Sequence, residues 1–165
     1  MKTKKSDWGA ISMGISFGIT SGIITTLGLI IGLDSALSSK LVVLGGILTI
    51  AIADAFSDAL GIHVSQESEN EHSPKEIWKA TIATFFAKLI FALTFAIPVL
   101  IFPLQTAVMI GVIWGLLVLA ILSWVIARHE NENPFKVIGE HLFIAVVVII
   151  ASHYVGDLIA KFFGG

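Results

Sequence analysis

Residues 41–62 read LVVLGGILTIAIADAFSDALGI, an apolar run that contains two carboxylates, Asp54 and Asp58. The run matches the roughly 20 residues that a helix needs to cross a bilayer. Residues four positions apart lie on the same face of a helix, so both carboxylates point the same way. An ionised carboxylate inside a membrane needs a cation, a basic partner or water to compensate it. The stretch therefore indicates ion handling within a membrane.

The composition of the whole chain supports a membrane protein. Hydrophobic residues make up 56% of its 165 residues and charged residues 13%, and the mean hydropathy is +0.93. Soluble domains carry about 25% charged residues, so a soluble fold is excluded as the main interpretation. The net charge of -2 gives no indication of nucleic acid as a partner. The absence of cysteine from the sequence excludes disulfides, thiolate metal sites and iron–sulfur clusters.

Five apolar segments predict an all-α fold, a bundle of five membrane-spanning helices in a single domain covering residues 1–165. The segments run approximately over residues 10–33, 41–62, 77–102, 104–127 and 135–160. The third and fourth form one block, which Pro98 and Pro103 are expected to break. Helix starts are indicated by Ser73-Pro74-Lys75-Glu76, which has the pattern of a capping box, and by Asn133-Pro134.

The distribution of Lys and Arg predicts an integral membrane protein with a cytoplasmic amino terminus and a carboxyl terminus outside. If the five segments alternate, only Lys40 and Lys161 fall on the outer side. The loops 63–76 and 128–136 are then cytoplasmic. The residues on the cytoplasmic side are Lys2, Lys4, Lys5, Lys75, Lys79, Arg128 and Lys136.

Glycine recurs every fourth residue in the first segment, at Gly14, Gly18 and Gly22. This spacing lets two helix backbones approach closely in a membrane. It predicts a close helix–helix contact, either within one subunit or at a twofold dimer interface.

Two stretches are similar to the vacuolar iron transporter family. Residues 18–32, GITSGIITTLGLIIG, resemble its first span, and residues 52–61, IADAFSDALG, resemble the pattern Ala-Asp-(Gly/Ala)-Phe-Ser-Met-(Ala/Gly)-x-Gly of its second span. The resemblance implies a homodimer that moves ferrous iron or another divalent metal out of the cytoplasm in exchange for protons. It places the metal path between the first two spans of each subunit. The expected partners of the protein are the metal ion, protons, the surrounding lipid bilayer and a second copy of the chain.

The chain departs from the family at several path positions. Ser21 stands where the family has an aspartate, Asp58 where it has a methionine, and Ile62 where a glutamate is often found. The larger helical metal-binding insert of some members is absent, since a short loop joins the second and third segments. Carboxylates suit Mn²⁺, Mg²⁺ and Ca²⁺, whereas a thioether favours softer metals. The exchange of methionine for aspartate therefore favours a divalent cation other than iron, although iron remains the family's substrate.

The expected metal-binding residues are Asp54, Asp58 and Ser21, with Glu67 at the cytoplasmic mouth of the path. The metal ion is a substrate, and no cofactor is expected. The sequence shows no phosphate-binding loop, nucleophile–base arrangement or cofactor fingerprint, so the protein is not expected to be an enzyme.

Lys88 leaves two interpretations open. It can form a structural ion pair with Asp54 or Asp58, or it can hold the acids as a built-in competitor of the cation. The alternative to transport is a structural or interaction module of the membrane, in which the acids pair with Lys88 to fix helix packing. A polar cavity from the acids to the cytoplasm would favour transport, and dry acids locked to Lys88 would favour the module.

Two histidine–carboxylate combinations lie in the last segment: Glu140 with His141, and His153 with Asp157. Such pairs can bind metal or carry protons. Polar residues are also common near membrane interfaces, where both combinations are expected, and this structural interpretation is favoured.

Cysteine labelling checks the predicted orientation. Because the sequence contains no cysteine, Ser68→Cys and Gly165→Cys each create a unique label site. An impermeant thiol reagent should reach the two positions from opposite sides of the membrane, with Ser68→Cys on the cytoplasmic side. Labelling of both positions from one side would contradict the five-span topology.

Overall fold

The protein is an all-helical bundle. The computed structural model describes the backbone of residues 2–164 and the side chains from Trp8 to Gly164; Lys2, Lys4, Lys5 and the label position Gly165 lie outside the described side chains. Six helices follow one another in this part of the chain. They are α1 (Lys2–Leu37), α2 (Lys40–Glu69), α3 (Pro74–Thr94), α4 (Ala96–Ile101), α5 (Leu104–Glu130) and α6 (Pro134–Phe163).

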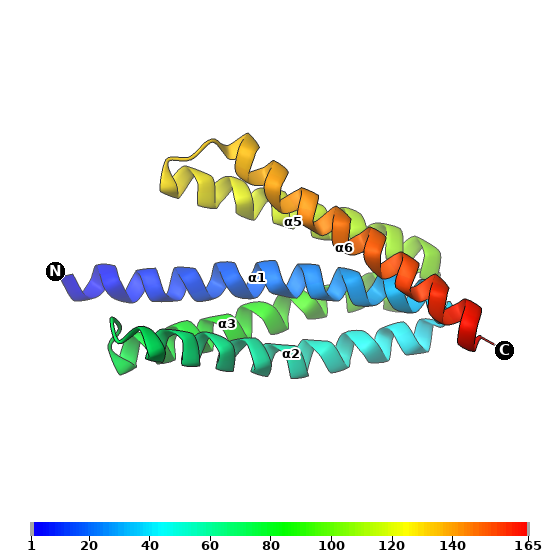
Figure 1. The fold of residues 1–165 in the computed structure, drawn as a ribbon, viewed down its shortest axis with the longest axis horizontal. Helices are drawn as coiled ribbons and strands as arrows, with labels where there is room; N and C mark the ends of the chain where they lie inside the picture. Colours follow the sequence, from blue (N-terminus) through cyan, green and yellow to red (C-terminus); the bar gives the residue numbers. More distant parts are fainter. Residues whose placement is uncertain (1, 165) are drawn as a thin grey trace.

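Five helical segments are long and apolar enough to cross a membrane, because α3 and α4 together count as one segment. The expectation of an all-α bundle with five such helices is confirmed. A chain that crosses a membrane an odd number of times has its two termini on opposite sides. In agreement with this, α1 begins at one end of the bundle and α6 ends at the other (Figure 1).

The short connections are shaped by capping residues. Ser73 and Glu76 form the predicted capping box at the start of α3, and the Asn133 side chain accepts from the Phe135 N–H at the start of α6. Asn70 and Asn131 end α2 and α5 in the left-handed conformation, with φ of 53° and 59°. Asparagine tolerates this conformation better than most residues, so it ends a helix efficiently.

The loop expected over residues 63–76 is mostly helix, which corrects the sequence-based boundary. Helix α2 continues to Glu69, and only residues 70–73 connect it to α3. The added turns carry polar residues such as Ser65, Glu67 and Ser68. Polarity ends the apolar segment at the membrane surface, but it does not end a helix whose backbone can continue into water.

Pro98 breaks the third span one turn earlier than its own position. Proline has no N–H to donate to the carbonyl four residues before it, which is that of Thr94. Helix α3 ends at Thr94, and the chain restarts as α4 after Phe95. Pro103 then separates α4 from α5, as the sequence predicts.

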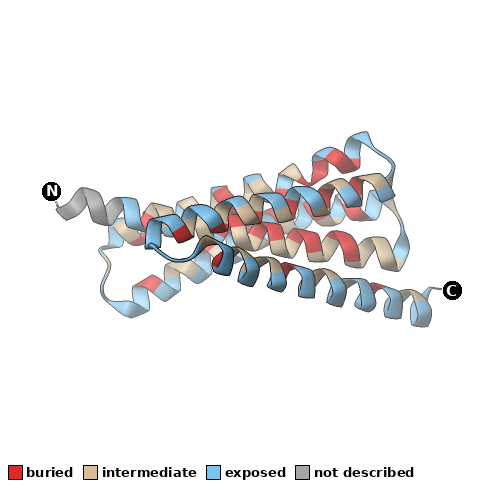
Figure 2. Ribbon diagram, turned by 90° about the horizontal axis from the view of Figure 1, so that it is seen from above, coloured by how far each residue is buried: buried red, intermediate tan, exposed pale blue. Residues whose placement is uncertain are grey.

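Helix α1 lies at the centre of the bundle. It packs most extensively against α3, then against α6, α2 and α5, and Figure 1 shows it between the α2–α3 pair and the α5–α6 pair. Its side chains Ile23, Leu27 and Ile30 are buried in the main hydrophobic core with residues of α2, α4 and α5. In contrast, α6 is exposed along most of its length (Figure 2).

The predicted close contact of the glycines is made within the chain, against α3. A Cβ atom at Gly14 would lie 2.4 Å from the Ala80 carbonyl oxygen, and one at Gly18 would lie 2.6 Å from that of Thr84. Both distances are shorter than side chains tolerate, so only glycine permits this approach of α1 to α3. These glycines therefore do not supply a dimer interface, which settles the alternative that the sequence left open.

Enlarging Gly18 should separate α1 from α3. We expect Gly18→Leu to lower the free energy of unfolding by about 3 kcal/mol, because the new side chain meets backbone atoms that cannot move aside. Thermal unfolding in detergent, followed by circular dichroism, measures the change. Gly139→Leu is the control, since no atom lies within 4 Å of its Cβ position. Equal stability of the two variants would contradict the close contact.

Candidate functional site

Asp54 and Asp58 lie one turn apart on α2, on the side of the helix that faces α1 and α3. Ala51, Ala55 and Ala59 on α2 are buried and small, so the backbone of α2 lies close to its neighbours. The two aspartates are next to this alanine row and are only partly covered, with 26% and 19% of their side chains exposed. Each aspartate is therefore partly accessible from the surface, although its carboxylate makes contacts inside the bundle.

Lys88 of α3 binds both carboxylates. Its side chain is 1% exposed, and its ammonium nitrogen lies 2.5 Å from an oxygen of each aspartate. The contact with Asp58 is also a hydrogen bond, whereas the Asp54 oxygen makes an ion pair without hydrogen-bond alignment. The pairing that the sequence predicts for Lys88 is therefore present with both acids.

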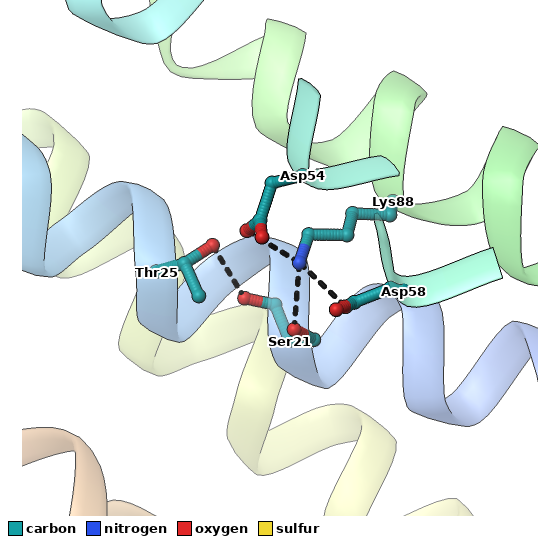
Figure 3. A network of polar contacts seen from close by, with 5 residues as sticks. All are labelled: Ser21, Thr25, Asp54, Asp58 and Lys88. Atoms are coloured by element: carbon teal, nitrogen blue, oxygen red, sulfur yellow. Dashed lines mark hydrogen bonds and ion pairs between the residues drawn. The ribbon is translucent and has the colours of Figure 1, made fainter. Parts of the chain in front are cut away.

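Ser21 of α1 completes the cluster. Its hydroxyl oxygen accepts a hydrogen bond from the Lys88 ammonium at 2.8 Å, and Figure 3 shows the ammonium between the oxygens of Ser21, Asp54 and Asp58. The backbone carbonyl of Ser21 accepts from the Thr25 hydroxyl. An ammonium has three N–H donors, and three oxygens from two other helices surround this one.

The cluster is not electrically balanced when every group is ionised. One ammonium neutralises only one of the two carboxylates, so one negative charge remains in surroundings of low dielectric constant. Ser21, Asp54 and Lys88 each lie near the midpoint of an apolar span. A net negative charge at this depth attracts a further cation or a proton.

A groove between α1 and α2 leads to Asp54. Its volume is about 650 Å³, and its walls are mainly apolar. Asp54 and Ser57 line the part of the groove nearest the middle of α2, and Leu33 and Val42 line the part near the α1–α2 connection. The groove therefore runs from the cluster towards the end of the bundle where α1 meets α2, which is the end opposite to Glu67. It is not the polar cavity towards the cytoplasm that would favour transport over the structural module.

Glu67 is not brought to this cluster. It lies on the exposed part of α2, nine positions after Asp58 along the helix. That spacing corresponds to about 13 Å along the axis and to nearly opposite faces. The structure therefore groups three of the four residues expected at the site and leaves Glu67 at the end of the helix.

The arrangement has oxygen ligands only. Among the residues whose placement is described, no three His, Cys, Asp or Glu side chains come together as a metal site. Two carboxylates and a hydroxyl surround one position, which the Lys88 ammonium occupies. Oxygen atoms of this kind suit hard divalent cations.

A polar contact at the other end of the bundle has no counterpart in the sequence analysis. His153 of α6 lies 3.5 Å from Asp157, as the spacing of four suggests, but its Nδ1 also lies 2.5 Å from the Ser35 hydroxyl of α1. Ser35 is 118 positions away in sequence. No local pattern could have indicated this partner, because only the packing of α6 on α1 brings the two residues together.

Fold and cluster together define the class: an integral membrane protein built from five apolar helical segments, with charged groups at the centre of its bundle. Residues 11–77 match the sequence model of the VIT family. This match confirms the resemblance to the vacuolar iron transporter family. It covers most of α1, all of α2 and the start of α3, and it includes Ser21, Asp54 and Asp58, whereas Lys88 lies outside it. No curated protein matches the chain.

The unequal charge count predicts a strongly non-additive effect of the two aspartates on stability. Asp54→Asn or Asp58→Asn alone should cost about 1 kcal/mol or less, because a one-to-one ion pair with Lys88 remains. The double variant leaves a buried ammonium without a carboxylate and should cost about 3–5 kcal/mol. Chemical unfolding of the three variants in detergent measures the difference. If the cost of the double variant equals the sum of the two single costs, one remaining carboxylate is not sufficient to stabilise the Lys88 ammonium.

Proposed function

We propose that the protein exports divalent metal ions from the cytoplasm by exchange with protons. The single observation that carries the proposal is the convergence of two carboxylates and a hydroxyl on one cation position inside the apolar bundle. The match to the VIT family over α1 and α2 supports a membrane metal transporter. Asp54, Asp58 and Ser21 would bind the metal.

The oxygen ligands favour manganese-like ions as substrates alongside ferrous iron. Asp58 replaces the soft thioether of the family pattern with a hard carboxylate, and Ser21 supplies a hydroxyl in place of a carboxylate. The site therefore has the same number of carboxylates as the family pattern, but it lacks the soft thioether ligand. We therefore expect Mn²⁺ to be carried at least as well as Fe²⁺.

Exchange with protons follows from the charges of the cluster. Two carboxylates close together in low dielectric repel one another, and the Lys88 ammonium compensates only one of the two charges. A divalent metal ion and a proton would therefore compete for the remaining negative charge, which is a basis for their exchange. Glu67, near the end of the membrane segment of α2, would collect cations at the cytoplasmic mouth.

A homodimer would cover a row of small exposed residues on α2. Gly45, Thr49, Ala53, Ser57 and Gly61 recur every four residues and are exposed in the single chain. Small residues at this spacing allow close helix packing in a membrane. A second copy on this face would also border the groove that leads to Asp54, so that the metal path would run between α1 and α2 of each subunit.

Metal flux into proteoliposomes tests the proposal. With a pH gradient imposed, wild-type protein should move Mn²⁺ and Fe²⁺ faster than Mg²⁺, with Co²⁺ as a fourth test ion. Asp54→Asn and Asp58→Asn should each lower Mn²⁺ flux by about tenfold or more, because a neutral amide replaces a charged ligand. Glu140→Gln is the matched control, since Glu140 is an exposed acid of α6 that pairs with Lys136. Full flux in both aspartate variants would rule out the proposed site.

The alternative function is a structural module of the membrane, and the complete burial of Lys88 favours it. In that case the ion pairs only fix the packing of α1, α2 and α3. The flux assay separates the two functions. A wild-type protein that moves none of the four metals, in either direction of the pH gradient, would rule out the proposed transport and favour the module.

A further inference from the structure

We propose that the Lys88 ammonium is a tethered cation that occupies the substrate position and makes the site selective for divalent over monovalent ions. The inference rests on the proposed function, because it concerns the same cluster. It adds a specificity-determining residue on α3, outside the stretch that matches the VIT family.

The first argument is that the ammonium and a metal ion need the same oxygens. The Ser21 hydroxyl and the two carboxylates are the proposed metal ligands, and all three contact the Lys88 nitrogen at 2.5–2.8 Å. A metal ion bound to these oxygens would lie where the nitrogen lies now. Two cations cannot share one such position, so the ammonium must leave before a metal binds.

The second argument is that the backbone of Lys88 is held in place against α1, so that its ammonium stays tethered to the cluster. Gly22 of α1 lies beside Lys88, with its Cβ position 3.2 Å from the Lys88 carbonyl oxygen and 3.4 Å from its Cα and Cγ atoms. The glycine contacts between α1 and α3 therefore fix the position of the Lys88 Cα atom relative to α1. A tethered group of this kind acts at a high effective concentration, so that dissolved cations must compete with it.

The third argument concerns charge. Sodium or potassium would replace one positive charge by another and would leave the second carboxylate uncompensated. A divalent ion neutralises both carboxylates, so it alone gains enough electrostatic energy to offset the cost of leaving the ammonium without its acids. The tethered lysine therefore excludes monovalent ions, which outnumber transition metals in cells, without any need for a narrow pore.

Binding of Mn²⁺ to purified protein tests this inference. Lys88→Met keeps an unbranched apolar side chain, one atom shorter than lysine, and removes the charge. It should bind Mn²⁺ about tenfold more tightly or better, because the competent fraction of sites is no longer limited by the ammonium. NaCl should compete with Mn²⁺ in Lys88→Met but not in the wild type, relative to choline chloride at equal ionic strength.

Two further variants separate the role of the charge from general effects. Lys88→Arg keeps a permanent positive charge and should show neither the gain in affinity nor the sodium competition. Lys136→Met removes a lysine from an exposed lysine–carboxylate pair on α6 and should behave as the wild type. Unchanged Mn²⁺ affinity and unchanged sodium exclusion in Lys88→Met would overturn the inference. If the wild type still transports metal, the proposed function survives that result.

A chemical replacement covers the case in which Lys88→Met does not fold. Lys88→Ala leaves a space that propylammonium fills, with the same number of atoms as the missing side chain. Propylammonium should stabilise this variant and compete with Mn²⁺, whereas the neutral and equally large propanol should not. Absence of competition by propylammonium would overturn the inference. Absence of Mn²⁺ binding in every variant and in the wild type would overturn the proposed function together with it.

Discussion

The ammonium of Lys88 joins three helices at the middle of the apolar bundle. It contacts a hydroxyl of α1 and two carboxylates of α2, and its own stem rises from α3. A charged group in such surroundings is stable only while partners surround it, and the same holds for the two acids. The relative positions of α1, α2 and α3 thus depend on this contact, and so does every function that the cluster could perform.

Close packing of α1 on α3 makes the contact possible. Lysine reaches Ser21 from α3 because Gly14, Gly18 and Gly22 let the two backbones approach. A larger residue on this face of α1 would move Lys88 outward and break its geometry. Packing and electrostatics are therefore not separate features of this protein, since the glycines place the charge that the acids require.

Much of this organisation can be predicted from the sequence. Apolar length indicates five spans, because the bilayer has a fixed thickness, and the capping box at Ser73 marks the start of α3. The spacing of Asp54 and Asp58 indicates one shared face of a helix. Boundaries are less predictable. The polar end of α2 reads as a loop, and the effect of Pro98 falls four residues upstream, at the carbonyl that loses its partner.

The sequence by itself determined the membrane bundle, the pair of acids on one helical face and the need for a compensating cation. These follow from local periodicity and from the cost of charge in an apolar medium. Only the tertiary structure decided that Lys88 binds both acids and Ser21 at once, that the glycines face α3 within the chain, that Glu67 stands apart, and that Ser35 meets His153. Such contacts join residues that are distant in sequence, and they depend on how whole helices pack rather than on any pattern within one of them.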